Sequence, residues 1–334
     1  MIVRALSIAF VAAAIATAAA ASPYKAPRTS FGDPDLQGLW TNASVTTLER
    51  PPYIKTLVIS PDVAAKLEAA NKAQLAENDK PTDPGKGAPA EGDDPGGYNS
   101  FWLDLGSKFG VVNGEIRSSW ITDPADGHVP YSEKGRRDTM ASAIPQFRNF
   151  DGPEVRSLGE RCIVGYGSTG GPPMLNVLYN NNYQIVQSPG FVTIVVEMNH
   201  DARIVRLNAQ HLPANMRPWM GDSIGHWEGN TLVVETTNLN PNQRFTADIR
   251  HRLYLSPDSK VTERFTRIAN DQILYEFKVE EPTAYTQPWS GQIPMHATKG
   301  PMYEYACHEG NYALKDILAG ARQEEKKPAS GGTK

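Results

Sequence analysis

The sequence predicts a mainly β fold, an antiparallel barrel or sandwich with one N-terminal helix and long loops. After residue 182, short runs rich in β-branched residues follow one another closely, and no helical pattern separates them. The run from Gln272 to Glu280 alternates apolar and polar residues, which is typical of a strand with one buried face. Hydrophobic residues make up 40% of the 334 residues, enough for the core of a single β-rich domain over residues 22–322.

The first 21 residues have the pattern of a secretory signal peptide. Arg4 precedes an uncharged stretch that ends in Ala19 to Ala21, and Ser22 follows. An uncleaved membrane anchor is the alternative, but the uncharged stretch is shorter than the about 20 residues of a spanning helix. We therefore expect export to the periplasm and no membrane span after the signal is removed.

The N-terminal half contains one clear helix signal. Ser60 suits the N-cap and Pro61 the first helical position, and good helix formers dominate from there to Glu77. Residues 78–100 are rich in Gly and Pro and predict a flexible loop. The polar segment 323–334 predicts a disordered tail.

The expected strands follow in chain order. The first one lies around the Gly-x-Trp sequence that ends at Trp40. A hairpin is expected where two β-branched runs flank the Ser-Pro-Gly turn at 188–190. The remaining strands are expected at residues 202–207, 231–237, 252–255, 260–268 and 272–280.

The two cysteines, Cys162 and Cys307, are a disulfide candidate because the predicted compartment is oxidising. Two buried free thiols are the alternative. A metal site built on cysteine is not expected, since neither residue has a second ligand at a suitable spacing.

The charge balance gives no reason to expect nucleic acid as a partner. The chain has 33 basic and 37 acidic residues, and its net charge is -4. We expect a small-molecule substrate or ligand instead, and no cofactor.

Three motif matches are set aside on their context. Residues 165–170 fit the dinucleotide fingerprint GxGxxG, but Gly171-Pro-Pro prevents the helix that must follow it. Ser223 sits in a GxSxG match without the strand-to-helix turn of a nucleophile elbow. Glu197 and His200 resemble half of a helical metal motif, but on a strand they would face opposite sides.

The candidate catalytic residues are histidines with neighbouring carboxylates, in segments expected to be loops or strand ends. His200 is the expected general base, oriented by Asp201, because histidine titrates near neutral pH and a carboxylate fixes its tautomer. His226 or His308 is the expected general acid, with Glu309 as a supporting carboxylate. Each histidine could instead be a hydrogen-bonded structural residue.

Four further residues are expected to bind the substrate. Arg217 and Asp222 lie in a loop that suits an anionic or carbonyl group, while Trp219 and Tyr305 would line the pocket. An ion pair of Arg217 or Arg203 with Asp222, tying the loop to the barrel, is the structural alternative.

Long motifs in this chain resemble those of a widespread family of exported bacterial proteins. They are PDLQGLW at residues 34–40, GDSIGHWEGNTLVVE at 221–235 and EYACHEGNY at 304–312. The resemblance implies export but no particular activity. The Gly-x-Trp opening is also similar to the lipocalin-like (calycin) barrels, and this similarity implies a ligand site inside the barrel.

The hypothesis that follows is a periplasmic, cofactor-independent enzyme that uses acid–base chemistry. A lyase, hydratase, isomerase or hydrolase acting on a small aromatic or sugar-like molecule fits these residues. The alternative is a non-catalytic, exported barrel that binds a small ligand. A third possibility is a metal site formed by His200, His226, His308 and Glu309. The enzyme requires the histidines to converge on one pocket, whereas the binder does not.

Overall fold

The computed structural model describes residues 24–80, 85 and 103–326. The predicted signal peptide, most of the predicted loop at 78–100 and residues 327–334 of the predicted tail lie outside these residues.

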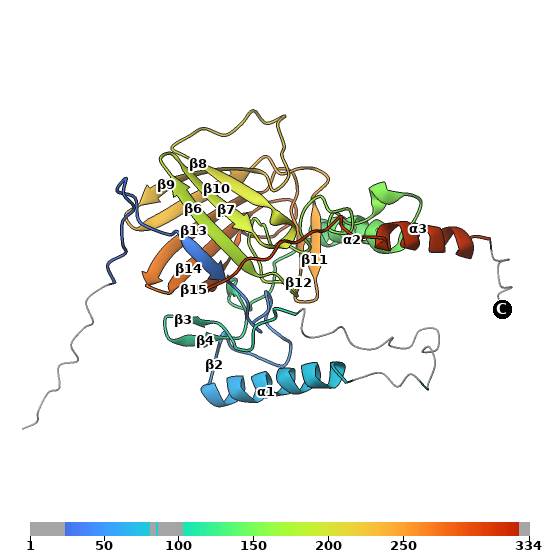
Figure 1. The fold of residues 1–334 in the computed structure, drawn as a ribbon, viewed down its shortest axis with the longest axis horizontal. Helices are drawn as coiled ribbons and strands as arrows, with labels where there is room; N and C mark the ends of the chain where they lie inside the picture. Colours follow the sequence, from blue (N-terminus) through green and yellow to red (C-terminus); the bar gives the residue numbers. More distant parts are fainter. Residues whose placement is uncertain (1–23, 81–84, 86–102, 327–334) are drawn as a thin grey trace, which may run out of the picture.

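Within the described residues, nine strands close into a barrel, which confirms the predicted fold class (Figure 1). The last strand, β15, pairs with the first, β1, so the sheet has no free edge at the closure. Around the ring the strands are β1 (Gly38–Thr41), β6 (Asn182–Ser188), β7 (Phe191–Val196), β8 (Ala202–Leu207), β9 (Asp222–Glu228), β10 (Thr231–Thr237), β13 (Lys260–Ala269), β14 (Gln272–Glu280) and β15 (Trp289–Ala297).

One neighbouring pair in the ring is parallel. Strands β8 and β9 place Arg206 beside Ile224 in parallel register, while every other pair in the ring is antiparallel. The connection over residues 208–221 is long enough to carry the chain back to the end of the barrel where β8 began. The barrel is therefore mixed, a detail that the strand pattern alone did not predict.

The alternation in β14 is confirmed. Ile273, Tyr275, Phe277 and Val279 are all buried in the main hydrophobic core. The neighbouring strands β13 and β15 present Phe265 and other apolar side chains to the same interior. The period-2 pattern thus identified the buried face of this strand correctly.

The predicted N-terminal helix is confirmed as α1 (Pro61–Asn78), and the Ser60 hydroxyl accepts a hydrogen bond from the Val63 amide at 3.4 Å. Ala64 of this helix packs against the small sheet rather than the barrel, together with Ile59. The small sheet consists of β2 (Val58–Ile59), β4 (Glu115–Arg117) and β3 (Val111–Val112), and α1 lies beside it below the barrel in Figure 1.

Several elements outside the ring were not predicted. Two more helices, α2 (Glu133–Arg148) and α3 (Ala313–Glu324), extend to one side of the barrel in Figure 1. Helix α3 ends within the segment expected to be a disordered tail, so that expectation is wrong for its first residues. The others are β5 (Ile121–Asp123), which adds to β15, the strand β11 (Phe245–Asp248), and the short 3₁₀ turns η3 (Pro153–Val155) and η4 (Met198–His200). Strand β11 pairs with β12 (His251–Tyr254), which confirms the strand predicted at 252–255 to within one residue at each end.

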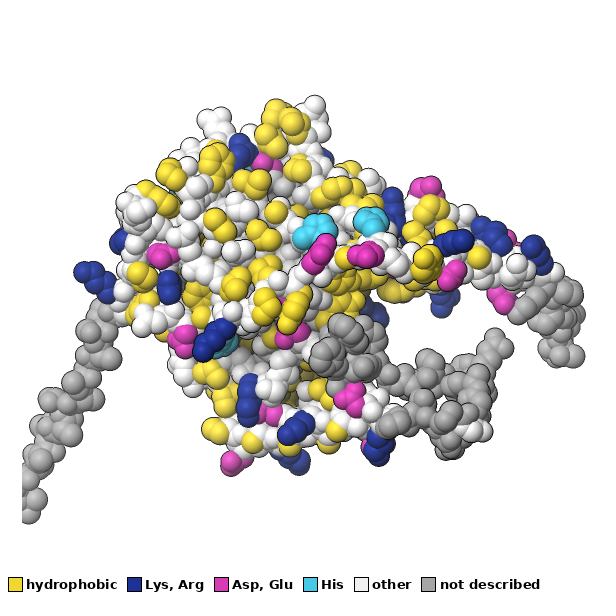
Figure 2. Space-filling model, viewed as in Figure 1, with side chains coloured by type: hydrophobic (Ala, Val, Ile, Leu, Met, Phe, Trp, Pro, Cys, Tyr) yellow, Lys and Arg dark blue, Asp and Glu magenta, His cyan; other side chains and the backbone are white. Residues whose placement is uncertain are grey.

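Acidic and basic side chains are interspersed on the face of the molecule shown in Figure 2. None of the helices in the described residues has both the length and the apolar character of a membrane-crossing helix.

Candidate functional site

The interior of the barrel is filled by side chains. Large aromatic residues occupy it and contact one another edge to face, as Phe277 and Trp289 do at a ring-centroid distance of 5.6 Å. A core packed in this way has no room for a ligand. The largest fully buried side chains of the core include Trp40, Trp120, Trp289, Tyr183, Tyr275, Tyr285 and Phe265.

A buried ion pair lies among these aromatic residues. The Arg203 guanidinium donates two hydrogen bonds to the Glu263 carboxylate, one of them at 2.9 Å, and the Tyr275 hydroxyl donates a third at 2.8 Å. Ser223 and Thr236 accept further bonds from Arg203 at 3.4 and 3.3 Å. The two opposite charges inside the barrel are therefore paired with each other, and only the Nε of Arg203 has no hydrogen-bond partner within this cluster.

Residues 157–181, here called the covering segment, close the end of the barrel where β6, β8 and β9 begin. The Met174 amide donates to the Tyr275 hydroxyl at 2.8 Å, and the Tyr183 hydroxyl donates to the Thr169 carbonyl at 3.1 Å. The GxGxxG match at 165–170 belongs to this segment, and no helix follows it, as predicted.

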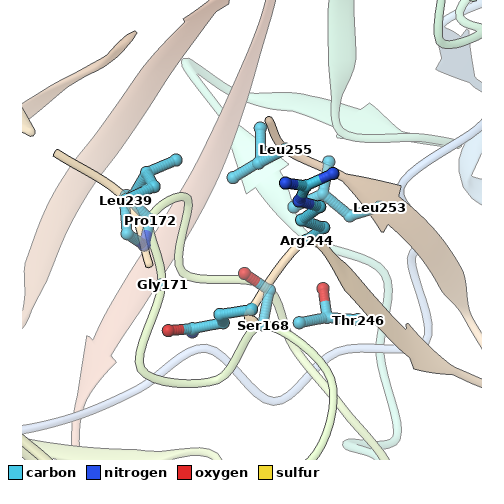
Figure 3. Close-up of a pocket in the computed structure, with 9 residues that line it drawn as sticks. Ser168, Gly171, Pro172, Leu239, Arg244, Thr246, Leu253 and Leu255 are labelled. Atoms are coloured by element: carbon cyan, nitrogen blue, oxygen red, sulfur yellow. The ribbon is translucent and has the colours of Figure 1, made fainter. Parts of the chain in front are cut away.

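A small cavity remains beneath the covering segment. Its volume is about 10 Å³, which is room for about one water molecule. The interior ligand site implied by the lipocalin-like resemblance has no space here. The residues labelled around this cavity in Figure 3 are Ser168, Gly171, Pro172, Leu239, Arg244, Thr246, Leu253 and Leu255.

A much larger cleft lies outside the barrel, beside the same end, and we call it the tyrosine cleft. Its volume is about 810 Å³. One wall is the covering segment and another is residues 303–312, here called the C-terminal arm. The lining residues are Leu103, Asp104, Tyr166, Tyr179, Asn180, Asn182, Glu197, Tyr303, Glu304, Tyr305, Ala306, Cys307 and Asn311.

The predicted disulfide between Cys162 and Cys307 is confirmed, with a sequence separation of 145. It joins the covering segment to the C-terminal arm, so it fixes two walls of the tyrosine cleft. Tyr179 and Tyr305 face each other from these walls with nearly parallel rings, 6.4 Å between centroids.

Two carboxylates are built into the cleft by hydrogen bonds. Glu197, at the end of β7, accepts from the Tyr303 amide at 2.9 Å and from the Asn182 side chain at 2.7 Å. Asp104 accepts from the Asn181 amide at 3.1 Å. Each carboxylate thus joins segments that are distant in sequence, and both remain on the surface of the cleft.

The electrostatics of the cleft are set by burial and by these two acids. Burial raises the pKa of Asp104, and the negative charge of Glu197 raises it further, while the Arg250 guanidinium acts in the opposite direction. Burial also raises the pKa of Tyr166 to about 12 and lowers that of Arg250 to about 10. At neutral pH the tyrosine is therefore neutral and the arginine charged.

The predicted base, His200, lies in η4 with an exposed side chain, next to Asp201. Asp201 accepts hydrogen bonds from the Gly165 amide at 2.7 Å and the Asn199 side chain at 3.2 Å, and burial raises its pKa. His200 is close enough to act on this carboxylate electrostatically. The hydrogen bonds nevertheless assign Asp201 to holding the covering segment, not to orienting His200.

His226 is placed away from His200. Asp222 begins β9 at the barrel end that carries His200, because β8 and β9 run parallel. His226 is four residues further along the strand, about 13 Å at the usual rise per residue. Its side chain is exposed, and Nε2 lies 3.2 Å from the Glu228 carboxylate. The structure does not bring these two histidines together.

His308 and Glu309 lie on the C-terminal arm, and both are exposed. Neither lines the tyrosine cleft, whereas their neighbours Tyr305 and Cys307 do. Of the residues predicted on this arm to form the site, the structure thus places Tyr305 in the cleft wall.

The loop at 208–221 carries the predicted substrate-binding residues Arg217 and Trp219, and it is fixed to neighbouring segments of the chain. The Arg217 guanidinium donates to the Leu239 carbonyl at 3.4 Å and pairs with Asp258 at 3.1 Å. Trp219 is exposed at the surface. These two residues therefore lie apart from the cleft lining.

Asp222 is the acid that ties this loop to the barrel. It pairs with Arg206 at 2.8 Å and with His211 at 2.8 Å, and it accepts from the Leu212 amide at 2.9 Å. Burial alone would raise its pKa, but these hydrogen bonds bring the pKa of Asp222 below its usual value. The structural alternative, an ion pair that anchors the loop, is correct for Asp222, although its partner is Arg206 rather than Arg203 or Arg217.

No group of three or more His, Cys, Asp or Glu side chains in the described residues is arranged to hold a metal ion. His200, His226, His308 and Glu309 therefore do not form the metal site considered from the sequence.

Sequence reasoning missed two important cleft residues. Asp104 follows the Gly- and Pro-rich stretch and carries no local motif, so no signal identified it. Glu197 was noticed with His200 but was judged on a strand, whereas the chain leaves β7 at Val196 and turns into η4. Tyr179 lies close to the C-terminal motif EYACHEGNY, and the only sequence signal for this was the predicted disulfide, which ties the motif to the segment that contains Tyr179.

Comparisons of the chain with protein-family models, with curated protein sequences and with solved structures each returned no match.

Proposed function

We propose that the protein binds a small organic molecule in the tyrosine cleft, as an exported binding protein. The observation that carries this proposal is the difference in free volume between the two regions. The cleft has about 810 Å³, whereas the interior of the barrel is filled by side chains. Small-molecule sites have volumes of about 300–1,000 Å³ and combine aromatic walls with a few fixed polar groups. Four tyrosines, three carboxylates and three asparagines provide such a lining.

Filling the cleft tests the proposal. Ala306 is exposed in the lining, so Ala306→Trp places a bulky side chain in the cleft without removing a hydrogen-bonded group. A library of small organic molecules is screened by thermal shift, since a ligand at 100 times its dissociation constant adds about 2.7 kcal/mol of stability. Hits should stabilise the wild type and fail to stabilise Ala306→Trp.

The matched control is Ala319→Trp, which adds the same side chain to an exposed position of α3 outside the cleft. This variant should respond to ligands like the wild type. Equal stabilisation of all three proteins would place the binding site elsewhere and contradict the proposal.

Acid–base catalysis in the same cleft is the second candidate, and the observation favouring it is the raised pKa of Asp104 beside Glu197. A carboxyl group with a raised pKa beside a second carboxylate is a common arrangement for acid–base catalysis. With a substrate in hand, Asp104→Asn should lower turnover by roughly 10²–10⁴-fold, the usual effect of losing such a group. Turnover that is unchanged in Asp104→Asn would remove this candidate.

The roles predicted for the histidines belong to the same second candidate. His200→Asn, His226→Asn and His308→Asn each replace an exposed ring, so the fold should be retained in all three. Only a loss of turnover in variants that still fold would support these histidines as catalytic residues. Near-full turnover in all three would leave the histidines with no catalytic role.

We also propose that the chain is exported, as the N-terminal sequence predicts. Fractionation of the producing cells and N-terminal sequencing test this. A periplasmic protein that begins at Ser22 is the expected result, and a cytoplasmic protein that begins at Met1 would contradict it.

A further inference from the structure

The charged residues that line the tyrosine cleft are all acidic. They are Asp104, Glu197 and Glu304, and the described lining contains no Lys, Arg or His. This inference rests on the proposed function and concerns the chemical class of the ligand. A cleft with this lining disfavours anions by direct repulsion.

Glu197 is the most unusual of the three acids because it is only 3% exposed. Its hydrogen-bond donors, the Tyr303 amide and the Asn182 side chain, are both neutral. In the described part of the chain, no basic nitrogen lies within 4 Å of its oxygens. Buried carboxylates are usually paired with a cation, so this charge lacks its usual partner.

Asp104 does not supply the positive charge that Glu197 lacks. The charge of Glu197 acts on Asp104 unfavourably, and Arg250, which does not line the cleft, acts favourably on Asp104. Arg250 donates to the Leu105 carbonyl at 3.0 Å and also interacts with Asp248. One guanidinium thus serves two carboxylates, Asp104 and Asp248, and the cleft keeps a net negative charge.

The tyrosine rings supply the second half of the recognition chemistry. Aromatic faces attract cations through the quadrupole of the ring, and such cages are used to bind quaternary ammonium groups. Tyr166 is neutral at physiological pH, and burial raises its pKa further, to about 12, so its ring and hydroxyl add no charge of their own. Tyrosine faces and uncompensated carboxylates together match a ligand that is both apolar and positively charged.

We propose that the ligand of the tyrosine cleft is an organic cation, a protonated amine or a quaternary ammonium compound. Its charged nitrogen lies near Glu197 and Asp104, and its apolar part lies against the tyrosine rings. A neutral sugar fills the same space but leaves the carboxylates without a counter-charge.

Pairs of cations and neutral molecules of the same shape provide the test. Choline is compared with 3,3-dimethylbutan-1-ol, benzylamine with benzyl alcohol, and putrescine with 1,4-butanediol, by calorimetry on the full mature chain. At least one cation should bind about tenfold or more tightly than its neutral partner, given the strength of ion and cation–π contacts in a partly desolvated site. The preference should weaken at high salt.

Glu197→Gln then tests the carboxylate directly. The amide oxygen retains the bond from the Tyr303 amide, and the Asn182 side chain can rotate to accept from the new amide group. Affinity for the cation should fall about tenfold, while that for the neutral partner stays the same. Glu154→Gln removes a charge from an exposed position outside the cleft and should change neither affinity.

If Glu197→Gln fails to fold, Glu304→Gln replaces it, because Glu304 is exposed and lines the same cleft. Neutral partners that bind as tightly as the cations, or variants that keep full cation affinity, would overturn the cation proposal and leave the proposed function intact. If neither these pairs nor the wider library bind the wild type, both the cation proposal and the proposed function are wrong.

Discussion

The barrel interior and the tyrosine cleft both bury a glutamate, and they treat it differently. Glu263 is 0% exposed in the interior and is paired with Arg203, with Tyr275 donating as well. Glu197 is 3% exposed at the cleft and receives bonds from neutral donors. The chain therefore completes the charge balance of the interior itself and leaves that of the cleft incomplete. This difference is the reason why we propose the barrel as the scaffold and the cleft as the ligand site.

The aromatic residues follow the same division. Tyr275 is buried and both donates and accepts hydrogen bonds within the interior. Tyr303 on the C-terminal arm is 70% exposed, although its amide is bound by Glu197. The cleft thus holds its backbone in place while its rings remain accessible to solvent.

The largest effect on stability is expected from removing one charge of the buried ion pair between Arg203 and Glu263. Arg203→Met leaves the Glu263 carboxylate buried without its cation, and this should lower the free energy of unfolding by about 3–5 kcal/mol. Urea denaturation followed by circular dichroism measures the loss.

The double variant Arg203→Met/Glu263→Leu is the control, because it removes both charges at once. Its loss should be less than half that of the single variant. A single variant that costs under about 1 kcal/mol would show that the interior charge is not balanced in the way described.

The disulfide connects the two walls of the cleft and should have the next largest effect. The two cysteines are 145 positions apart, so the disulfide closes a long loop in the unfolded chain. The double variant Cys162→Ser/Cys307→Ser removes this constraint and should lower the free energy of unfolding by about 2–4 kcal/mol. Ligand binding in the cleft should weaken as well. Two alkylatable thiols in wild-type protein, unfolded without reductant, would contradict the bridge.

His251 tests the region beneath the covering segment, where its ring lies beside Gly167. Burial lowers the pKa of His251 to about 3, so the folded protein holds it neutral, whereas the unfolded chain takes up a proton near pH 6.5. Stability from this group is complete above pH 6.5 and is lost as the pH falls towards 3. Between pH 7 and pH 4.5 the loss should be about 2–3 kcal/mol.

Urea denaturation of the wild type and of His251→Phe is measured at both pH values. The free energy of unfolding of His251→Phe should fall less on acidification than that of the wild type, by about 2–3 kcal/mol. His226→Phe replaces an exposed histidine and should retain the wild-type pH dependence. The same acid sensitivity in wild type and His251→Phe would assign the effect to other groups.

The smallest effect on stability is expected for Tyr303→Ala, because the ring is largely exposed. The free energy of unfolding should change by no more than about 0.5 kcal/mol. Affinity for a cleft ligand should nevertheless fall measurably by calorimetry. A variant with unchanged affinity would remove the Tyr303 ring from the binding surface.

Sequence patterns predicted the barrel well where one face of a strand is buried. The runs at 231–237 and 272–280 match β10 and β14 residue for residue. Alternation identified the second run, and the first is rich in β-branched residues. Helix α2 was missed because it contains Gly135 and Pro145, which both disfavour a helix interior. The mixed character of the barrel depends on a loop, and loops carry no such periodicity.

The candidate site was predicted only in part. Cys307 and Tyr305 stood out because they belong to one dense motif, and the disulfide pairing followed from compartment chemistry. Asp104 and Glu197 approach each other through tertiary packing of segments far apart in the chain, which one sequence cannot show. The histidines attracted attention by their type, yet His226 and His308 have exposed side chains outside the cleft lining.

A crystallographic soak with a library of small organic fragments tests the central claim most directly. If the tyrosine cleft is the ligand site, bound fragments should cluster between the covering segment and the C-terminal arm, with cationic fragments near Glu197. Fragments that cluster inside the barrel around Arg203 and Glu263, or that avoid the cleft altogether, would contradict the account.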